Sequence, residues 1–218
     1  MLYVEGARDR EILECWARRV DPGLARCIGH NTVILGGRRP ARAIADFQKR
    51  GGTAAGYSGL VVLDRDNQPH AGPTGRSKSI GRDAGLEIFV WSLRHIESYL
   101  LVPAAIRRML RLGPEDRTVE SFIEINRADD ATAVPTKEAP ERAAEGVTAR
   151  VRGSLHAKRV LGAGGSLSEA LGTELRAGDI ARAMRIEDLH GDVRELFDRI
   201  GTLSGLAVRR PEVVIRSS

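Results

Sequence analysis

Hydrophobic residues between the N-terminus and Val90 alternate between short apolar runs and longer amphipathic stretches. The short runs predict four β-strands, at residues 2–4, 32–35, 59–63 and 86–91. Helical spacing predicts a helix over 10–20 and another that starts at Pro40 and stops at Gly51. Continuous apolar strands joined by helices are typical of a parallel sheet that is buried on both faces. The pattern therefore predicts an α/β fold with helices flanking a parallel sheet.

The pattern changes after about Leu101. Four segments with helical period follow, at residues 103–112, 118–125, 179–186 and 193–200, and no convincing strand separates them. The stretch 127–146 is polar and rich in alanine, which indicates a loop or a poorly ordered segment. The sequence thus predicts an α/β domain over residues 1–101 and a helical appendage over residues 102–218.

Composition and charge narrow the classes of protein that fit this pattern. With 218 residues, 42% of them hydrophobic, the chain is long enough to bury a sizeable core. A net charge of +5 permits a polyanionic partner. Cys15 and Cys27 form no disulfide or zinc motif, which favours a reducing, cytoplasmic compartment. No apolar run approaches the ~18–20 residues of a membrane span, so no membrane partner is expected.

Acidic residues follow the predicted strands at the points where those strands end. Glu5 follows the first strand, Asp64 and Asp66 follow the third, and Glu97 comes shortly after the fourth. Asp9 lies in the helix after the first strand. Because the carboxyl ends of parallel strands meet at one edge of a sheet, these acids are expected to converge there. Asp64 is expected to face solvent.

Converging carboxylates repel one another, and hard divalent cations neutralise them. Five acids suffice for two Mg²⁺ or Mn²⁺ ions about 3.5–4 Å apart, an arrangement that serves in-line displacement at phosphorus. Other interpretations stay open for each residue. Asp64 and Asp66 could cap a turn, Asp9 could be an acid favoured by the helix dipole, and Glu97 could lie on a solvated helix.

Three motifs together resemble the Toprim domain of OLD-family (overcoming lysogenization defect) nucleases: YVEGARD at 3–9, LDRD at 63–66 and HIESYLL at 95–101. The resemblance implies a Toprim-like Rossmannoid sheet over 1–101 and two divalent metal ions held by five acids. These are Glu5, which also has a catalytic role, Asp9, Asp64, Asp66 and Glu97. A thinner resemblance at 154–162, SLHAKRVLG, implies that Lys158 stabilises negative charge in the transition state.

The family resemblance implies a metal-dependent DNA nuclease, and it also implies partners. Family members are ATPase–nuclease fusions, so we expect this chain to be a fragment that follows an upstream ATPase domain, with oligomerisation through that domain. The fragment itself is expected to have no ATP site. The nearest P-loop lookalike, GPTGRSKS at 72–79, lacks a glycine immediately before Lys78.

Basic residues near the predicted acid cluster suggest a phosphate interface. Arg38 and Arg39 follow the second strand and are candidates for DNA binding, with solvated loop arginines as the open alternative. Arg107 and Arg108 are expected on a solvated helix face. His95 lies close to Glu97, but a hard-metal site disfavours it as a ligand. With 4% aromatic residues, contacts to the DNA backbone should outweigh base stacking.

Two other functions remain open from the sequence. A haloacid-dehalogenase-like phosphatase also carries D-x-D after an apolar strand, with the first acid, here Asp64, as nucleophile. A nucleic-acid-binding or assembly module without catalysis would share the basic charge and keep only a vestigial metal site. A phospho-aspartyl intermediate would indicate the phosphatase, and DNA binding without cleavage would indicate the module.

Overall fold

The computed structural model describes residues 1–65, 85–113, 115–131 and 157–206. Four strands, β1 (Leu2–Val4), β2 (Thr32–Ile34), β3 (Gly59–Leu63) and β4 (Leu86–Val90), form a sheet in the order β2-β1-β3-β4. Leu2 of β1 is in register with Thr32 and with Leu60, and both pairings are parallel. Backbone bonds from Gly59 N to Gly85 O and from Trp91 N to Leu63 O join β3 to β4 in the same sense. The predicted parallel sheet is confirmed.

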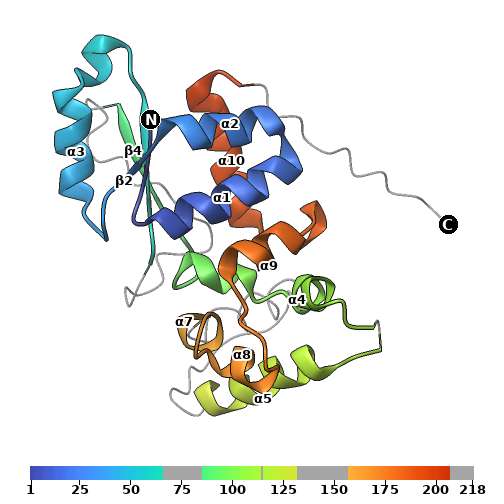
Figure 1. The fold of residues 1–218 in the computed structure, drawn as a ribbon. Coiled ribbons are helices and arrows are strands. Elements are labelled where there is room, and N and C mark those ends of the chain that lie inside the picture. The colour runs from blue at the N-terminus through green and yellow to red at the C-terminus, as the bar shows by residue number, and fades with distance from the viewer. Residues whose placement is uncertain (66–84, 114, 132–156, 207–218) are drawn as a thin grey trace, which may run out of the picture. The chain divides into compact units, whose positions relative to one another are not determined.

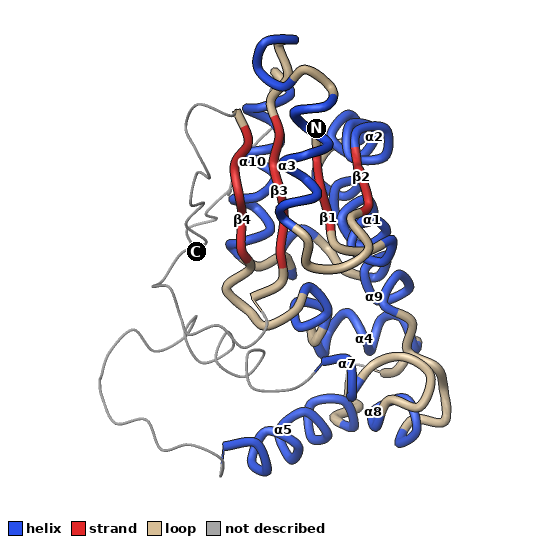
Figure 2. The backbone as a smooth tube through the Cα atoms, turned by 90° about the vertical axis from the view of Figure 1, so that its left-hand side faces the viewer, coloured by secondary structure: helices blue, strands red, loops and turns tan. Residues whose placement is uncertain are grey.

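Helices cover both faces of the sheet (Figures 1 and 2). The helix α3 (Pro40–Lys49) lies on one face, and α1 (Ala7–Val20), α2 (Pro22–Asn31) and α10 (Gly191–Ser204) lie on the other. A short 3-10 helix, η1 (Gly52–Ala55), follows α3. The core between sheet and helices includes Tyr3, Trp16 and Phe47, which are almost fully buried. The predicted α/β class, with helices flanking a parallel sheet, is therefore correct.

The helix α2 was not predicted, and a capping pattern explains why it forms. Asp21 ends α1 in an extended conformation, and its carboxylate accepts hydrogen bonds from the backbone N–H groups of Gly23 and Leu24. Pro22 occupies the first position of α2, where its missing N–H costs nothing. The Asp-Pro pair thus turns the chain directly from α1 into a second helix, which packs against α1.

The region after β4 is helical in its described part. It contains η3 (Ile96–Leu100), α4 (Pro103–Leu110), α5 (Thr118–Ala131), α7 (Ala157–Val160), α8 (Ser166–Ala170), α9 (Ala177–Ala183) and η4 (Ile186–Asp188). The helix α4 packs against α5 and α9. Arg108 of α4 donates to the backbone oxygen of Ala183 at 3.1 Å and pairs with Asp188. Within the described part of 101–190 no strand occurs, as predicted, although α5 extends into the stretch predicted as a loop.

Contacts group the chain into two compact units that differ from the predicted boundary after Leu101. The first unit includes Met1–Val62 and also α10, and the second includes the helices from η3 to η4. The helix α10 belongs to the first unit because its apolar residues, among them Leu196 and Phe197, are buried and it packs against α2. No helix in the described residues is both long and apolar enough to cross a bilayer.

Candidate metal centre

Glu5 directly follows β1, and the loop after β2 packs against it. The backbone oxygen of Glu5 accepts a hydrogen bond from Gly37 N at 2.9 Å. The guanidinium Nη1 of Arg38 lies 4.0 Å from Glu5 Oε1, and both side chains are mostly buried. Gly36 and Gly37 have positive φ angles of 72° and 113°, which allow the tight turn that brings Arg38 back to the end of β1. Arg38 therefore lies beside a predicted acid, as expected from its place after β2.

Asp9 lies in the first turn of α1, close to the turn that Glu5 begins. A β-carbon at Gly6 would lie 3.1 Å from Asp9 Oδ2, which is tighter than ordinary contact. The glycine therefore leaves room for the carboxylate of Asp9 to fold back over the turn between β1 and α1. Glu5 and Asp9 are thus placed on the same short segment, at the carboxyl end of a parallel strand.

Asp64 directly follows β3 and is buried, with 6% of its surface exposed. Its Oδ1 accepts a hydrogen bond from the backbone N–H of Ile96 at 2.9 Å, and its Oδ2 lies 3.2 Å from His95 Nδ1. The expectation that Asp64 faces solvent was wrong. The chain leaves β4 at Trp91, whose N–H bonds Leu63 O, and residues 95 and 96 then lie against the Asp64 carboxylate.

Glu97 lies one residue further on, in η3, with 5% of its surface exposed. The turn that carries it is held by a backbone bond from Ser98 N to His95 O at 2.9 Å and by a bond from Leu93 N to the Tyr99 hydroxyl at 3.0 Å. Burial rules out the solvated-helix interpretation of Glu97. A buried carboxylate is costly unless hydrogen bonds or a cation compensate it.

The helix that carries Lys158 packs against the turn that carries Glu97. This helix, α7, contacts η3, and Ala157 and Val160 of α7 are buried. The helix α7 (Ala157–Val160) lies within 154–162, the stretch that carries the thinner resemblance. The side chain of Lys158 lies outside the described part of the chain, as does Asp66. The backbone of position 158 belongs to the same compact unit as Asp64 and Glu97.

The structure brings the predicted residues together in two groups. Glu5, Asp9 and Arg38 belong to the first unit, and Asp64 and Glu97 belong to the second. Within the described residues, no group of three or more His, Cys, Asp or Glu side chains is close enough together to hold a metal ion. The donors themselves fit a hard cation, because they are carboxylates, and Asp64 has the outer hydrogen bonds that orient metal-ligating carboxylates.

The contact between His95 and Asp64 was not predicted from the sequence. The sequence placed it near Glu97 and raised it only as a metal ligand, whereas the structure shows it bonded to Asp64. The contact joins residues 31 positions apart, so spacing along the chain could not reveal it. The nearest indication in the sequence was a titratable ring two residues before a candidate acid.

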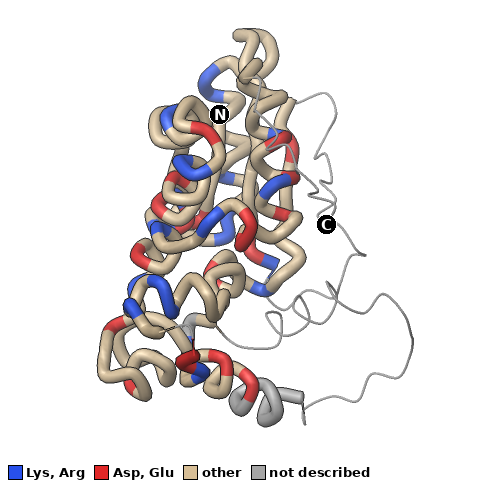
Figure 3. Tube along the Cα trace, turned by 90° about the vertical axis from the view of Figure 1, so that its right-hand side faces the viewer, with Lys and Arg blue, Asp and Glu red and all other residues tan. Residues whose placement is uncertain are grey.

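Figure 3 marks the Lys and Arg positions beside the Asp and Glu positions along the Cα trace, and several arginines outside this site form ion pairs with acids. Arg107 lies 3.2 Å from Glu120, and Arg108 pairs with Asp188. These two side chains are therefore ion-paired and half-buried, which differs from the predicted solvated face. Arg39 is exposed and has no ion-pair partner within the described residues. It remains the more accessible of the two predicted DNA contacts.

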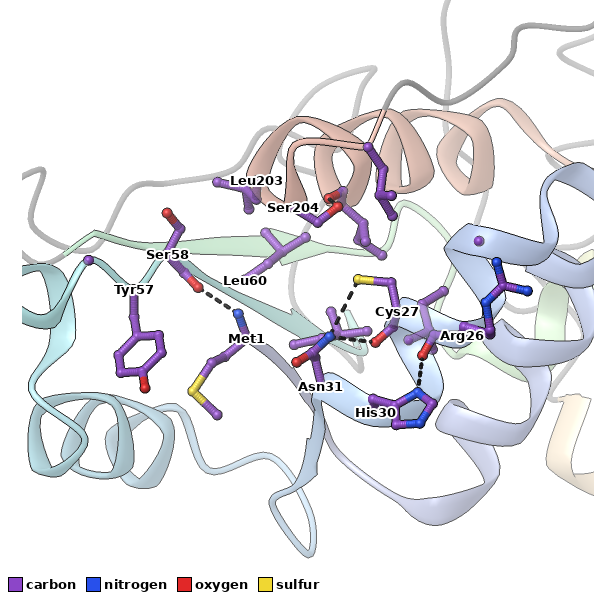
Figure 4. Close-up of a pocket in the computed structure, with 16 residues that line it drawn as sticks. Met1, Arg26, Cys27, His30, Asn31, Tyr57, Ser58, Leu60, Leu203 and Ser204 are labelled. Carbon is purple, nitrogen blue, oxygen red and sulfur yellow. Dashed lines mark hydrogen bonds between the residues drawn. The ribbon is translucent and has the colours of Figure 1, made fainter.

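A groove of about 700 Å³ lies elsewhere in the first unit (Figure 4). Met1, Asn31 and Ser58, which precede β1, β2 and β3, contribute to its wall. Asn31 Nδ2 lies 3.6 Å from Cys27 Sγ inside it. The groove is thus formed at the amino ends of the strands. None of the predicted site residues that the structure describes lines this groove.

No protein-family model matches the chain, and no curated protein matches it. The C-terminal region of the Burkholderia pseudomallei OLD protein is similar in structure, with 17% identity and a TM-score of 0.43, over 92% of this chain and 96% of that one. The C-terminal region of the Xanthomonas campestris pv. campestris OLD protein has 15% identity and a TM-score of 0.42, over 93% of this chain and 94% of that one. Both are C-terminal regions of OLD proteins, the family that the sequence motifs resemble.

Proposed function

We propose that the chain is a divalent-metal-dependent nuclease domain that hydrolyses phosphodiester bonds in DNA. The observation that carries the proposal is the buried carboxylate of Asp64 at the end of an inner strand of a parallel sheet, held by two hydrogen bonds. Ligands of open α/β sheets bind at the carboxyl ends of the strands. A buried, oriented carboxylate at that position is suited to bind a cation, which offsets the cost of its burial.

The motif resemblance assigns the remaining ligands. Glu5, Asp9, Asp64, Asp66 and Glu97 would together hold two Mg²⁺ or Mn²⁺ ions, and Glu5 would also act in catalysis. When bound, such ions supply charge neutralisation and an activated water. Lys158 would stabilise the negative charge that develops on the phosphoryl oxygens. The packing of α7 against η3 supports this role, because it places the backbone of position 158 beside the turn that carries Glu97.

Arg38 and Arg39 would bind the phosphates of the DNA substrate. Arg38 lies beside Glu5, so it could hold a phosphate next to the acidic residues, whereas Arg39 is exposed to approaching DNA. The motif resemblance further suggests an upstream ATPase domain in the whole protein, oligomerisation through it, and a cytoplasmic location.

Incubation of the purified chain with supercoiled and linear DNA tests the proposal. Mg²⁺ and Mn²⁺ should support cleavage, whereas Ca²⁺ or a chelator should not. The decisive variant is Asp64→Asn, because an amide oxygen can still accept the Ile96 N–H while the ligand charge is lost. We expect cleavage to fall by about 10²-fold or more, as when a transition-state stabiliser is removed.

Asp116→Asn is the matched control. Asp116 also accepts a backbone hydrogen bond, from Thr118 N at 2.9 Å, but this bond is exposed to solvent and lies outside the predicted site. Full cleavage by Asp64→Asn would contradict the site assignment. Binding of DNA without cleavage under every metal would indicate a non-catalytic module. A phosphorylated Asp64 after incubation with a phosphomonoester would indicate the phosphatase.

A further inference from the structure

Asp64 accepts hydrogen bonds from two consecutive residues that are far from it in the sequence. Ile96 N–H donates to Oδ1 at 2.9 Å, and His95 Nδ1 lies 3.2 Å from Oδ2. A metal-ligating carboxylate is ionised and only accepts hydrogen bonds, so Nδ1 must carry the proton and donate it. Each carboxylate oxygen therefore has at least one donor from the chain, and these donors fix the plane of the carboxylate.

The imidazole that donates this bond is itself held in place. His95 is 6% exposed, and its backbone oxygen accepts a bond from Ser98 N at 2.9 Å. Glu97, the next proposed ligand, follows two residues later and is 5% exposed. The bonds from residues 95 and 96 thus connect the end of β3 to the turn that carries Glu97. A loss of the His95 bond would remove the donor that His95 provides to Oδ2, so that the carboxylate plane would be held less tightly relative to that turn.

We propose that His95 is a positioning residue, whose Nδ1–H orients Asp64 for cation binding and connects it to the turn that carries Glu97. The inference rests on the proposed function, since it assigns to His95 the orientation of a proposed ligand. It differs from direct ligation, in which a ring nitrogen of His95 would bind the metal. Outer partners of this kind typically change metal affinity by about 10–100-fold when they are removed.

Two amide substitutions distinguish the roles of the two ring nitrogens of His95. The amide nitrogen of Asn is the same number of bonds from Cα as His Nδ1, and that of Gln is the same number as His Nε2. His95→Asn therefore keeps a donor toward Asp64, whereas His95→Gln moves the donor to the far side of the ring. His95→Ala removes the donor and serves as a second variant if His95→Gln does not fold. The matched pair is His30→Asn and His30→Gln, because His30 is an exposed residue of α2 whose Nδ1 bonds the backbone oxygen of Arg26.

The primary measurement is Mn²⁺ binding to the purified full chain without DNA. The electron paramagnetic resonance signal of free Mn²⁺ monitors this binding. The rise in melting temperature on Mn²⁺ addition is measured alongside, and the melting temperature without metal reports folding. We expect His95→Gln and His95→Ala to weaken Mn²⁺ binding by about 10–100-fold. His95→Asn should stay within a few-fold of wild type, and both His30 variants should match wild type.

Three results would overturn the inference. The first is a wild-type Mn²⁺ affinity in both His95→Gln and His95→Ala. The second is an equal loss of Mn²⁺ affinity in His95→Asn and His95→Gln. The third is a loss of Mn²⁺ affinity in His95→Asn alone, which would indicate direct ligation through Nε2. The proposed function is judged separately. A wild-type chain that binds Mn²⁺ but does not cut DNA contradicts the nuclease while the variants still decide the role of His95. A wild-type chain that binds no Mn²⁺ overturns both.

Discussion

Position 158 offers the sharpest test at the scale of single residues. Its helix packs against the turn of Glu97, and we propose that the ammonium of Lys158 meets charge that develops during cleavage. Such a group acts more in the transition state than in the ground state. Lys158→Ala should therefore lower the single-turnover cleavage rate by about 10²-fold, with DNA and Mn²⁺ affinities nearly unchanged.

Arg159→Ala is the control for Lys158, because Arg159 is the next residue of α7 and is exposed. It should change the rate little and weaken DNA binding only slightly. Lys158→Arg should restore only part of the cleavage rate, since a planar guanidinium does not copy a compact ammonium. An unchanged single-turnover rate in Lys158→Ala would place this residue outside the active site.

The strand β1 gives a test at the scale of elements, because a hydrogen bond from its Tyr3 joins it to α3. Tyr3 is fully buried, and its hydroxyl donates to Asp46 Oδ2 of α3 at 3.0 Å. Tyr3→Phe leaves the ring in place but removes the donor. We expect the free energy of unfolding, measured in urea at neutral pH, to fall by about 0.5–1.5 kcal/mol.

The effect of Tyr3→Phe should depend on pH in a definite direction. Hydrogen bonds from Arg50 and from Tyr3 hold the pKa of Asp46 below its ordinary value. A depressed acid pKa contributes stability above the unfolded value of about 3.9 and loses it as pH falls through the folded value. The difference between wild type and Tyr3→Phe should therefore narrow below about pH 4. An equal difference at all pH values would show that Asp46 is not the relevant acceptor.

We propose that the chain binds DNA, and its overall charge predicts how that binding depends on salt. The net charge is +5, aromatic residues make up 4% of the chain, and many arginines already pair with acids. If DNA is bound through its phosphates, the logarithm of the association constant should fall linearly with the logarithm of salt concentration. The slope should be about −0.9 per phosphate neutralised. Arg39→Ala should reduce the slope by about one unit, whereas Arg182→Ala, which removes an arginine paired with Asp179, should change it less. A salt-independent affinity would point to base stacking or to a substrate other than nucleic acid.

Local pattern was sufficient to predict the elements of the α/β unit. Strands β1, β2, β3 and β4 were predicted nearly at their observed limits, because continuous apolar runs bounded by glycine or polar residues have few alternatives. The helix α2 was missed, although Asp21 caps it and its buried Leu24 and Ile28 are spaced four residues apart. The membership of α10 in the first unit was also missed. Periodicity shows that a helix has an apolar face, but it does not show which surface covers that face.

For the candidate site, too, the sequence determined some features and the tertiary structure decided others. The sequence alone determined that Glu5 and Asp64 directly follow strands and that Asp9 and Glu97 lie further along, because continuous apolar runs locate the ends of the strands. Only the tertiary structure decided that Asp64 is buried and that residues 95 and 96 bond its two oxygens. Those bonds form because the chain returns past the end of β3 after leaving β4. Contacts across such separations depend on how segments pack in space, which spacing along a sequence does not encode.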